Sequence, residues 1–117
     1  MFSCDALTLT QLVLRYEHLL HTARPTAVLV EHDRWRTAST LVLTARAAGI
    51  PTFTLFHGVV NRPSLYAPLL ADVGLCWGEL TKRRMIELGT PAERLTVVGC
   101  QRLTRDLALT PAEARTK

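Results

Sequence analysis

Four short apolar segments constrain the fold of this chain more than any other feature of its sequence. They are residues 26–31, 50–56, 73–77 and 95–98. All are rich in Val, Leu, Thr or Phe, which is typical of strands buried in a sheet. The helical patterns beside them are residues 7–22, 37–48 and 79–88. Because strands that alternate with helices form βαβ units, we expect an α/β fold, a Rossmann-like half with about four parallel strands and helices on both faces.

Local signals indicate where the helices begin and end. Thr8 with Gln11 has the spacing of a capping box at the start of the first helix. Pro25 prevents that helix from continuing, because proline disfavours a helical conformation at the residue before it. Gly49 and Gly89 are expected to end the next two helices in the left-handed conformation.

The connections are expected to be short or irregular. Residues 59–68 are predicted to be a loop, and residues 69–72 a short helical turn. The sequence TPAE at 90–93 predicts a turn capped by Thr90, and the same sequence at 110–113 predicts the start of a further helix.

Length and composition favour one soluble domain. The chain has 117 residues, of which 48% are hydrophobic and 21% charged, so a sizeable core is possible. No apolar stretch approaches the roughly 20 residues of a membrane span. Asp5 interrupts the place where a signal peptide would be apolar, so we expect a cytoplasmic protein. The cysteines Cys4, Cys76 and Cys100 lack Cys-x-x-Cys spacing and are expected to be small, mostly buried thiols.

The basic charge of the chain is mild and scattered. The net charge is +4, and its densest cluster, residues 82–84, falls on a predicted helix, where a solvated face explains it. Aromatic residues do not interleave with the basic ones, and no known nucleic-acid motif is present. We therefore expect no nucleic-acid partner.

Polar residues or glycines follow each predicted strand at its carboxyl end. They are Glu31 to Asp33, His57 with Gly58, Gly78 with Glu79, and Gly99 to Arg102. In a parallel sheet these groups line one edge, which is where open α/β sheets bind ligands. Glycine there lets a backbone amide approach a ligand closely. If Gly58 has a close neighbour or a positive φ, Gly58→Val should destabilise the domain by more than the ~1 kcal/mol typical of point mutants. A helix that begins near Glu79 also points amides towards this edge.

Each of these residues also has an explanation that needs no ligand. His57 fits a structural, hydrogen-bonded histidine about as well, and Glu31 to Asp33 fit a solvated loop. Gly78 and Gly99 are usual in tight turns, and Glu79 favours a helix start through the helix dipole. It is the presence of four such groups at one edge that favours a ligand-binding site.

Several kinds of site are absent from the sequence. The phosphate loop G-x-x-x-x-G-K-[ST], the dinucleotide pattern G-x-G-x-x-G and the nucleophile elbow G-x-S-x-G do not occur. His32, Asp33 and His57 have side chains able to bind a metal, but their spacing is no better than chance. We expect no metal site and no cofactor bound by this chain.

The order of the short motifs resembles a known enzyme family. They are VLVEHD at 28–33, ARAAGIPT at 45–52, HG at 57–58, PLLAD at 68–72, WGE at 77–79 and RLTVVG at 94–99. In this order they are similar to the amino-terminal domain of GT-B-fold glycosyltransferases, especially the bacterial surface-polysaccharide and CDP-glycerol glycerophosphotransferase-like branch. The resemblance covers about residues 25 to 105. It weakens after Gly99, where the family usually has proline, arginine and then aspartate, and this chain has CQRLT at 100–104.

The resemblance implies how the chain is organised. Residues 1–105 are expected to be a Rossmann-like acceptor-side domain, incomplete at its N-terminus. Residues 106–117 would be a linker and the start of a helix that leads into a missing carboxyl-terminal domain. That second domain would bind the nucleotide-activated donor, and a sugar or polymer acceptor would be the partner of this one. The complete protein would make cell-surface polysaccharide, with possible peripheral membrane association, and this chain alone would be inactive.

The resemblance also implies roles for residues of the edge. His57 would be catalytic, either as a general base on an acceptor hydroxyl or as a donor to developing phosphate charge. The substrate-binding residues would be Glu31, Asp33, Gly58, Gly78 and Glu79. Two alternatives stay open: a stand-alone binding or regulatory domain of the same fold, and half of an enzyme like the sugar-nucleotide 2-epimerases.

Overall fold

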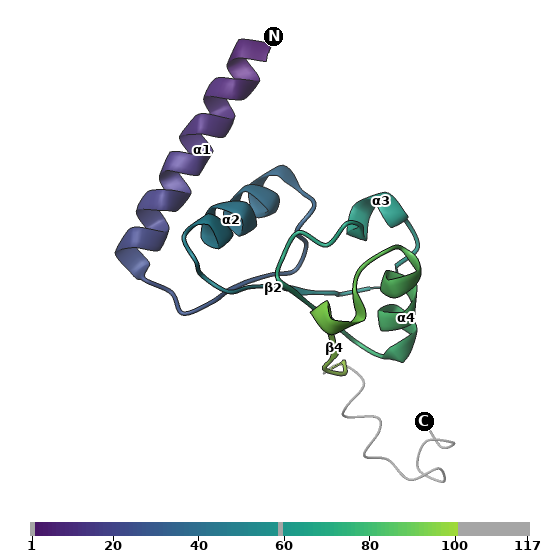
Figure 1. Cartoon of the computed structure of the whole chain (residues 1–117). Helices are drawn as coiled ribbons and strands as arrows, with labels where there is room; N and C mark the ends of the chain where they lie inside the picture. The colour runs from purple at the N-terminus through teal and green to yellow at the C-terminus, as the bar shows by residue number, and fades with distance from the viewer. Residues whose placement is uncertain (1, 59, 101–117) are drawn as a thin grey trace, which may run out of the picture.

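The structure has the alternating helices and strands that the sequence predicts (Figure 1). The computed structural model describes residues 2–58 and 60–100, and only the backbone of residues 2–4. The helices are α1 (Phe2–Ala23), α2 (Arg36–Ala47), α3 (Pro63–Tyr66), α4 (Glu79–Glu87) and the 3-10 helix η1 (Ala92–Arg94). The strands are β1 (Val28–Val30), β2 (Thr52–Leu55), β3 (Val73–Cys76) and β4 (Leu95–Val97).

The four strands form one parallel sheet in the order β1-β2-β3-β4. In register, Val28 pairs with Thr52, Phe53 with Val73, and Gly74 with Leu95. Four parallel strands with helices around them confirm the predicted α/β, Rossmann-like class.

The connecting helices all cover the same face of the sheet. One core cluster contains Val42 of α2, Tyr66 of α3 and Met85 of α4. The expectation of helices on both faces is therefore wrong for the described residues. The reason is the strand order: each right-handed connection steps in the same direction, so each helix returns to the same face. On the second face, Leu29 is 60% exposed and Phe53 is only half-buried.

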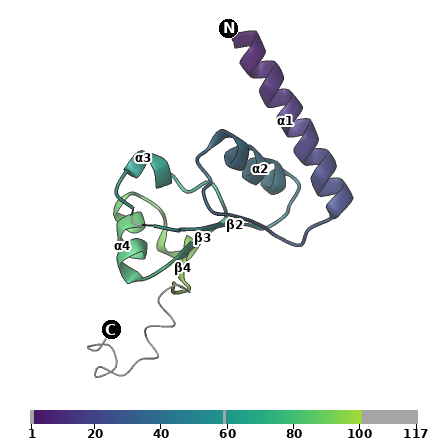
Figure 2. The ribbon, with the colours of Figure 1, turned by 180° about the vertical axis from the view of Figure 1, so that it is seen from behind.

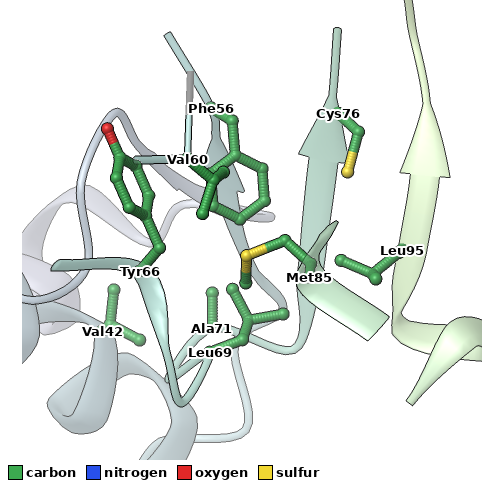
Figure 3. Close-up of a cluster of buried hydrophobic side chains, with 9 residues drawn as sticks. All are labelled: Val42, Phe56, Val60, Tyr66, Leu69, Ala71, Cys76, Met85 and Leu95. Atoms are coloured by element: carbon green, nitrogen blue, oxygen red, sulfur yellow. The ribbon is translucent and has the colours of Figure 1, made fainter. Parts of the chain in front are cut away.

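The hydrophobic core lies between this face and the helices (Figure 3). Phe56 follows directly after β2 and is 1% exposed, and Met85 of α4 is completely buried. Full burial of a side chain of this size stabilises the fold by about 1.5–3 kcal/mol. The core thus fixes the carboxyl end of β2, one residue before His57.

Helix α1 is longer than expected and packs over only part of its length. It begins at Phe2 rather than near residue 7, so Thr8 lies inside the helix and the predicted capping box with Gln11 does not exist. Leu20 packs with Val28 and Ala45 in a second small cluster. The rest of α1 extends away from the sheet (Figures 1 and 2).

The predicted ends of α2 and α4 are confirmed, whereas two other connections differ from expectation. Gly49 and Gly89 follow these helices with φ of 75° and 102°. Helix α3 lies within the predicted loop and starts with Pro63, a residue well suited to a first helical turn, while residues 69–72 are not helical. The side chain of Thr90 caps nothing, because η1 begins after Pro91 and has no side-chain cap.

Residues 68–72 join α3 to β3 without regular structure and are held by arginines instead. Arg46 of α2 donates from Nη1 to the Leu70 carbonyl at 2.8 Å. Arg94 of η1 donates from Nε to the Asp72 carbonyl at 3.1 Å. These bonds satisfy peptide groups that have no partner in a strand or helix. The segment is therefore held between α2 and η1, and it ends with Asp72 bonded to Thr52 at the start of β2.

Candidate functional site

The groups predicted at the strand ends lie at one edge of the sheet. Strand β1 ends at Val30, just before Glu31, and β2 ends at Leu55, just before Phe56 and His57. Strands β3 and β4 end shortly before Gly78 and Gly99. Because the strands are parallel and paired in register, these four ends share the carboxyl edge. The predicted residues Gln101 and Arg102 and the predicted linker and helix start at 106–117 lie outside the described residues.

His57 connects the ends of β1 and β2. Its Nδ1 lies 3.1 Å from the carbonyl oxygen of Glu31, and the residue is exposed. A carbonyl oxygen only accepts, so Nδ1 must carry the proton in this contact. In the neutral ring Nε2 then has a free lone pair. This is the arrangement that a general base at the edge requires.

His32 belongs to the site by its position in the fold. Its ring centroid lies 6.3 Å from that of His57, 5.6 Å from that of Tyr66 and 5.4 Å from that of Trp35. Only its neighbours in space single it out, because its position in the sequence gives no ligand pattern. Tyr66 comes from α3, within a segment predicted to be a plain loop, so no sequence signal places it beside His32.

The surroundings of His32 favour its neutral form. Burial lowers its pKa below the ordinary value of 6.5; the charge of Asp33 opposes this shift, and those of His57 and Arg34 add to it. Nδ1 accepts a hydrogen bond from the backbone N–H of Arg34 at 3.2 Å. The neutral ring therefore carries its proton on Nε2. His32 is thus a hydrogen-bond donor close to His57, which is a hydrogen-bond acceptor.

Asp33 is buried rather than available to a substrate. It is 2% exposed, and Oδ2 accepts hydrogen bonds from the backbone N–H groups of Leu70 at 2.7 Å and Ala71 at 3.0 Å. This geometry favours a structural role, in which the carboxylate attaches the segment 68–72 to the end of β1. The predicted contact between Asp33 and a substrate has no support in its position.

Gly58 meets neither condition under which its replacement by valine was predicted to be costly. Its φ is not positive, and a Cβ atom there would meet nothing within 4 Å. It lines an apolar cavity of about 240 Å³ together with Val60 of the same connection, Trp77 after β3, and Leu80, Thr81 and Arg84 of α4. The cavity places Gly58 beside the start of α4, but no close backbone approach demands a glycine.

Gly78 and Glu79 begin helix α4. Gly78 is the N-cap residue in an extended conformation, with no side-chain cap, and Glu79 lies exposed in the first turn. A carboxylate in this position stabilises the helix dipole without any ligand. Glu31 is also exposed, at the end of β1. The structure brings the Glu31 backbone into contact with His57, whereas no hydrogen bond or ion pair links Gly78 or Glu79 to that histidine among the described residues.

The described part of the chain contains no reactive thiol or metal site formed by its buried cysteine and its acidic groups. Burial raises the pKa of the Cys76 thiol to about 11, as suits an inert core residue. No group of three or more His, Cys, Asp or Glu side chains with metal-binding geometry occurs among residues 2–58 and 60–100. No helix in these ranges is long and apolar enough to cross a membrane.

Comparisons with known proteins find structures with a similar fold, but no family to which the chain can be assigned. The sequence matches no protein-family model and no curated protein. Among solved structures, it is similar to S. aureus MnaA in its complex with UDP, with a TM-score of 0.57 and 20% identity. It is also similar to UDP-N-acetylglucosamine 2-epimerase from Rickettsia bellii, with a TM-score of 0.59 and 20% identity.

The matched region is most of this chain but only a small part of each structural neighbour. They cover 76% and 95% of this chain, but only 26% and 33% of the two neighbours. The chain thus spans about a quarter to a third of the proteins that it resembles. At this identity the likeness concerns the fold alone, the Rossmann-like arrangement of four parallel strands and their helices.

Proposed function

We propose that this chain is the Rossmann-like acceptor-side part of a sugar-nucleotide-dependent enzyme, with His57 acting on a substrate hydroxyl at the carboxyl edge. The observation that carries the proposal is the contact between His57 Nδ1 and the Glu31 carbonyl, which leaves Nε2 as a proton acceptor. His32, neutral and protonated on Nε2, adds a donor 6.3 Å away between ring centroids. A hydroxyl group is able to donate to the first ring and accept from the second.

The leading reaction is transfer of a glycosyl or glycerophosphoryl group to an acceptor hydroxyl in cell-surface polysaccharide synthesis. Such a transfer needs a base for the attacking hydroxyl, which is the role assigned to His57. The nucleotide-activated donor would bind in a second, carboxyl-terminal domain. In this proposal the complete protein is cytoplasmic and associates peripherally with the membrane.

The second candidate is half of an enzyme like the sugar-nucleotide 2-epimerases. The structural similarity to UDP-N-acetylglucosamine 2-epimerase from Rickettsia bellii favours it. Both candidates place a sugar near the carboxyl edge and need further polypeptide for activity. The apolar second face of the sheet, where Leu29 is 60% exposed, is consistent with a domain that packs against more protein.

The proposal is tested by binding. We expect amides near His57 to shift in NMR spectra when a nucleotide sugar, CDP-glycerol or a free sugar is added to the chain, because one of these resembles the substrate. Comparing the shifts caused by each ligand distinguishes the two candidates, because an epimerase-like half is not expected to prefer CDP-glycerol. If none of these compounds moves any signal at the carboxyl edge, the proposed function is wrong.

Replacing His57 by alanine should separate catalysis from stability. The side chain is exposed and makes one hydrogen bond to a backbone carbonyl, so we expect the free energy of unfolding to fall by no more than about 1 kcal/mol. In the complete enzyme, kcat should fall by roughly 10²–10⁴-fold if the ring transfers a proton. His57→Gln is the matched control, because its amide is able to donate to the Glu31 carbonyl but cannot act as a base. A large loss of stability with normal turnover per folded molecule would show that His57 is structural.

A further inference from the structure

A row of four rings runs from the core to the surface at the carboxyl edge. Phe56 is in contact with Tyr66 at a centroid distance of 5.8 Å, and Tyr66 with His32 at 5.6 Å. His32 is in contact with Trp35 at 5.4 Å and an interplanar angle of 32°. The first two rings belong to the buried cluster of Figure 3, and the last is 67% exposed.

The exposed indole at the end of this row has no other explanation in the fold. Trp35 precedes α2 as its N-cap residue and makes no side-chain hydrogen bond to the helix. Within residues 2–58 and 60–100 its ring contacts His32 alone, and His32 is itself half-buried against Tyr66. A large apolar surface is thus held towards solvent by rings anchored in the core. Fixing an aromatic side chain before a ligand arrives lowers the entropic cost of binding.

The groups around Trp35 resemble those that hold a sugar ring. A pyranose has an apolar C–H face that stacks on an aromatic ring, and hydroxyl groups around its rim that need donors and acceptors. Here an exposed indole stands beside His32 as a donor, His57 as an acceptor and the exposed residue Glu31. Binding sites for small ligands typically combine an apolar surface with a few placed polar groups in this way.

We propose that Trp35 is a stacking platform for a pyranose ring, which it positions against His57 and His32. The inference deepens the proposed function and rests on it, because it assigns the sugar rather than the nucleotide of the substrate to this end of the edge. The two arginines that flank Trp35 both have partners already. Arg34 donates to the Pro68 carbonyl at 3.5 Å, and Arg36 forms an ion pair with Asp5 at 3.7 Å, which makes a phosphate contact there less favourable. Trp35 is a positioning residue and takes no part in proton transfer.

The indole N–H group of Trp35 is itself a probe for this proposal. Trp35 and Trp77 are its only tryptophans, so two indole N–H signals are expected in an NMR spectrum, and Trp35→Phe assigns them. Four ligands divide the chemistry: UDP-N-acetylglucosamine has a pyranose and a base, N-acetylglucosamine has only the pyranose, and UDP and CDP-glycerol have a base but no pyranose. We expect the Trp35 signal to move with the first two ligands and to stay in place with the others.

Affinity provides the second measurement. Trp35→Ala removes the stacking ring and should raise Kd for the pyranose ligands by about tenfold, which corresponds to about 1.4 kcal/mol. Trp35→Phe keeps a ring and should retain most of the affinity. Circular dichroism and the unchanged signal of Trp77 show that each variant is folded.

The possible failures are distinguishable. If UDP moves the Trp35 signal as strongly as UDP-N-acetylglucosamine does, and the free sugar does not, the platform binds a base and the proposal is wrong. If ligands shift amides near His57 while Kd is the same in Trp35→Ala, the stacking role is refuted and the proposed function survives. If no ligand shifts any signal at the edge, the proposed function itself fails and this inference fails with it.

Discussion

Gly74→Val should lower the free energy of unfolding by about 3 kcal/mol, the upper end of the usual cost of overpacking a core. A Cβ atom at this position would lie 2.9 Å from Leu95 Cδ2 and 2.9 Å from Phe56 Cε2. Both neighbours are almost completely buried, at 3% and 1% exposure, so neither side chain has free space to move into. Denaturant unfolding of the variant and the parent chain measures the difference.

Gly58→Val is the matched control for this experiment. The same substitution at Gly58 meets nothing within 4 Å and no positive φ, so its cost should stay within about 0.5 kcal/mol. Equal losses at the two glycines would show that backbone conformation rather than core packing sets the cost. The two variants also test whether Gly58 has a special role, as the sequence alone suggests, or whether Gly74 does.

The fold class was predictable because each strand and helix carries its own local signal. Apolar β-branched segments and periodic helices suffice to predict βαβ units, and the glycines after α2 and α4 have the expected positive φ. The packing of all the connecting helices on one face was not predicted. It depends on the order of strands in the sheet, a long-range property that no segment encodes by itself.

The candidate site was predictable only in outline. The strand ends identified His57 and Glu31, and these residues are in contact. The contacts of Trp35 and Tyr66 with His32 were not predictable, because a sequence does not show which aromatic rings meet in space. Asp33 was assigned to a substrate for a related reason. The sequence does not distinguish an exposed carboxylate at a strand end from one that is buried and hydrogen-bonded. Asp33 is of the second kind, because it accepts hydrogen bonds from a segment almost forty residues away.

Asp33→Ala should lower the free energy of unfolding by about 3 kcal/mol, because it leaves buried donors without partners. Its Oδ2 accepts from the backbone N–H groups of both Leu70 and Ala71, and the alanine variant replaces neither bond. Asp33→Asn should cost roughly half as much, since an amide oxygen still accepts, though without a charge. Denaturant unfolding of the two variants gives the order of the losses.

Glu31→Ala is the control that separates burial from charge at this edge. It removes an exposed carboxylate two residues away and keeps the backbone carbonyl that holds His57, so stability should change by less than about 0.5 kcal/mol. Asp33 also follows His32 directly, so the loss of its two bonds should alter the ring row and move the indole signal of Trp35. Glu31→Ala should leave that signal in place. If Asp33→Ala proves as stable as Glu31→Ala, the buried carboxylate does not hold segment 68–72, and a role for Asp33 in binding a substrate becomes the better explanation.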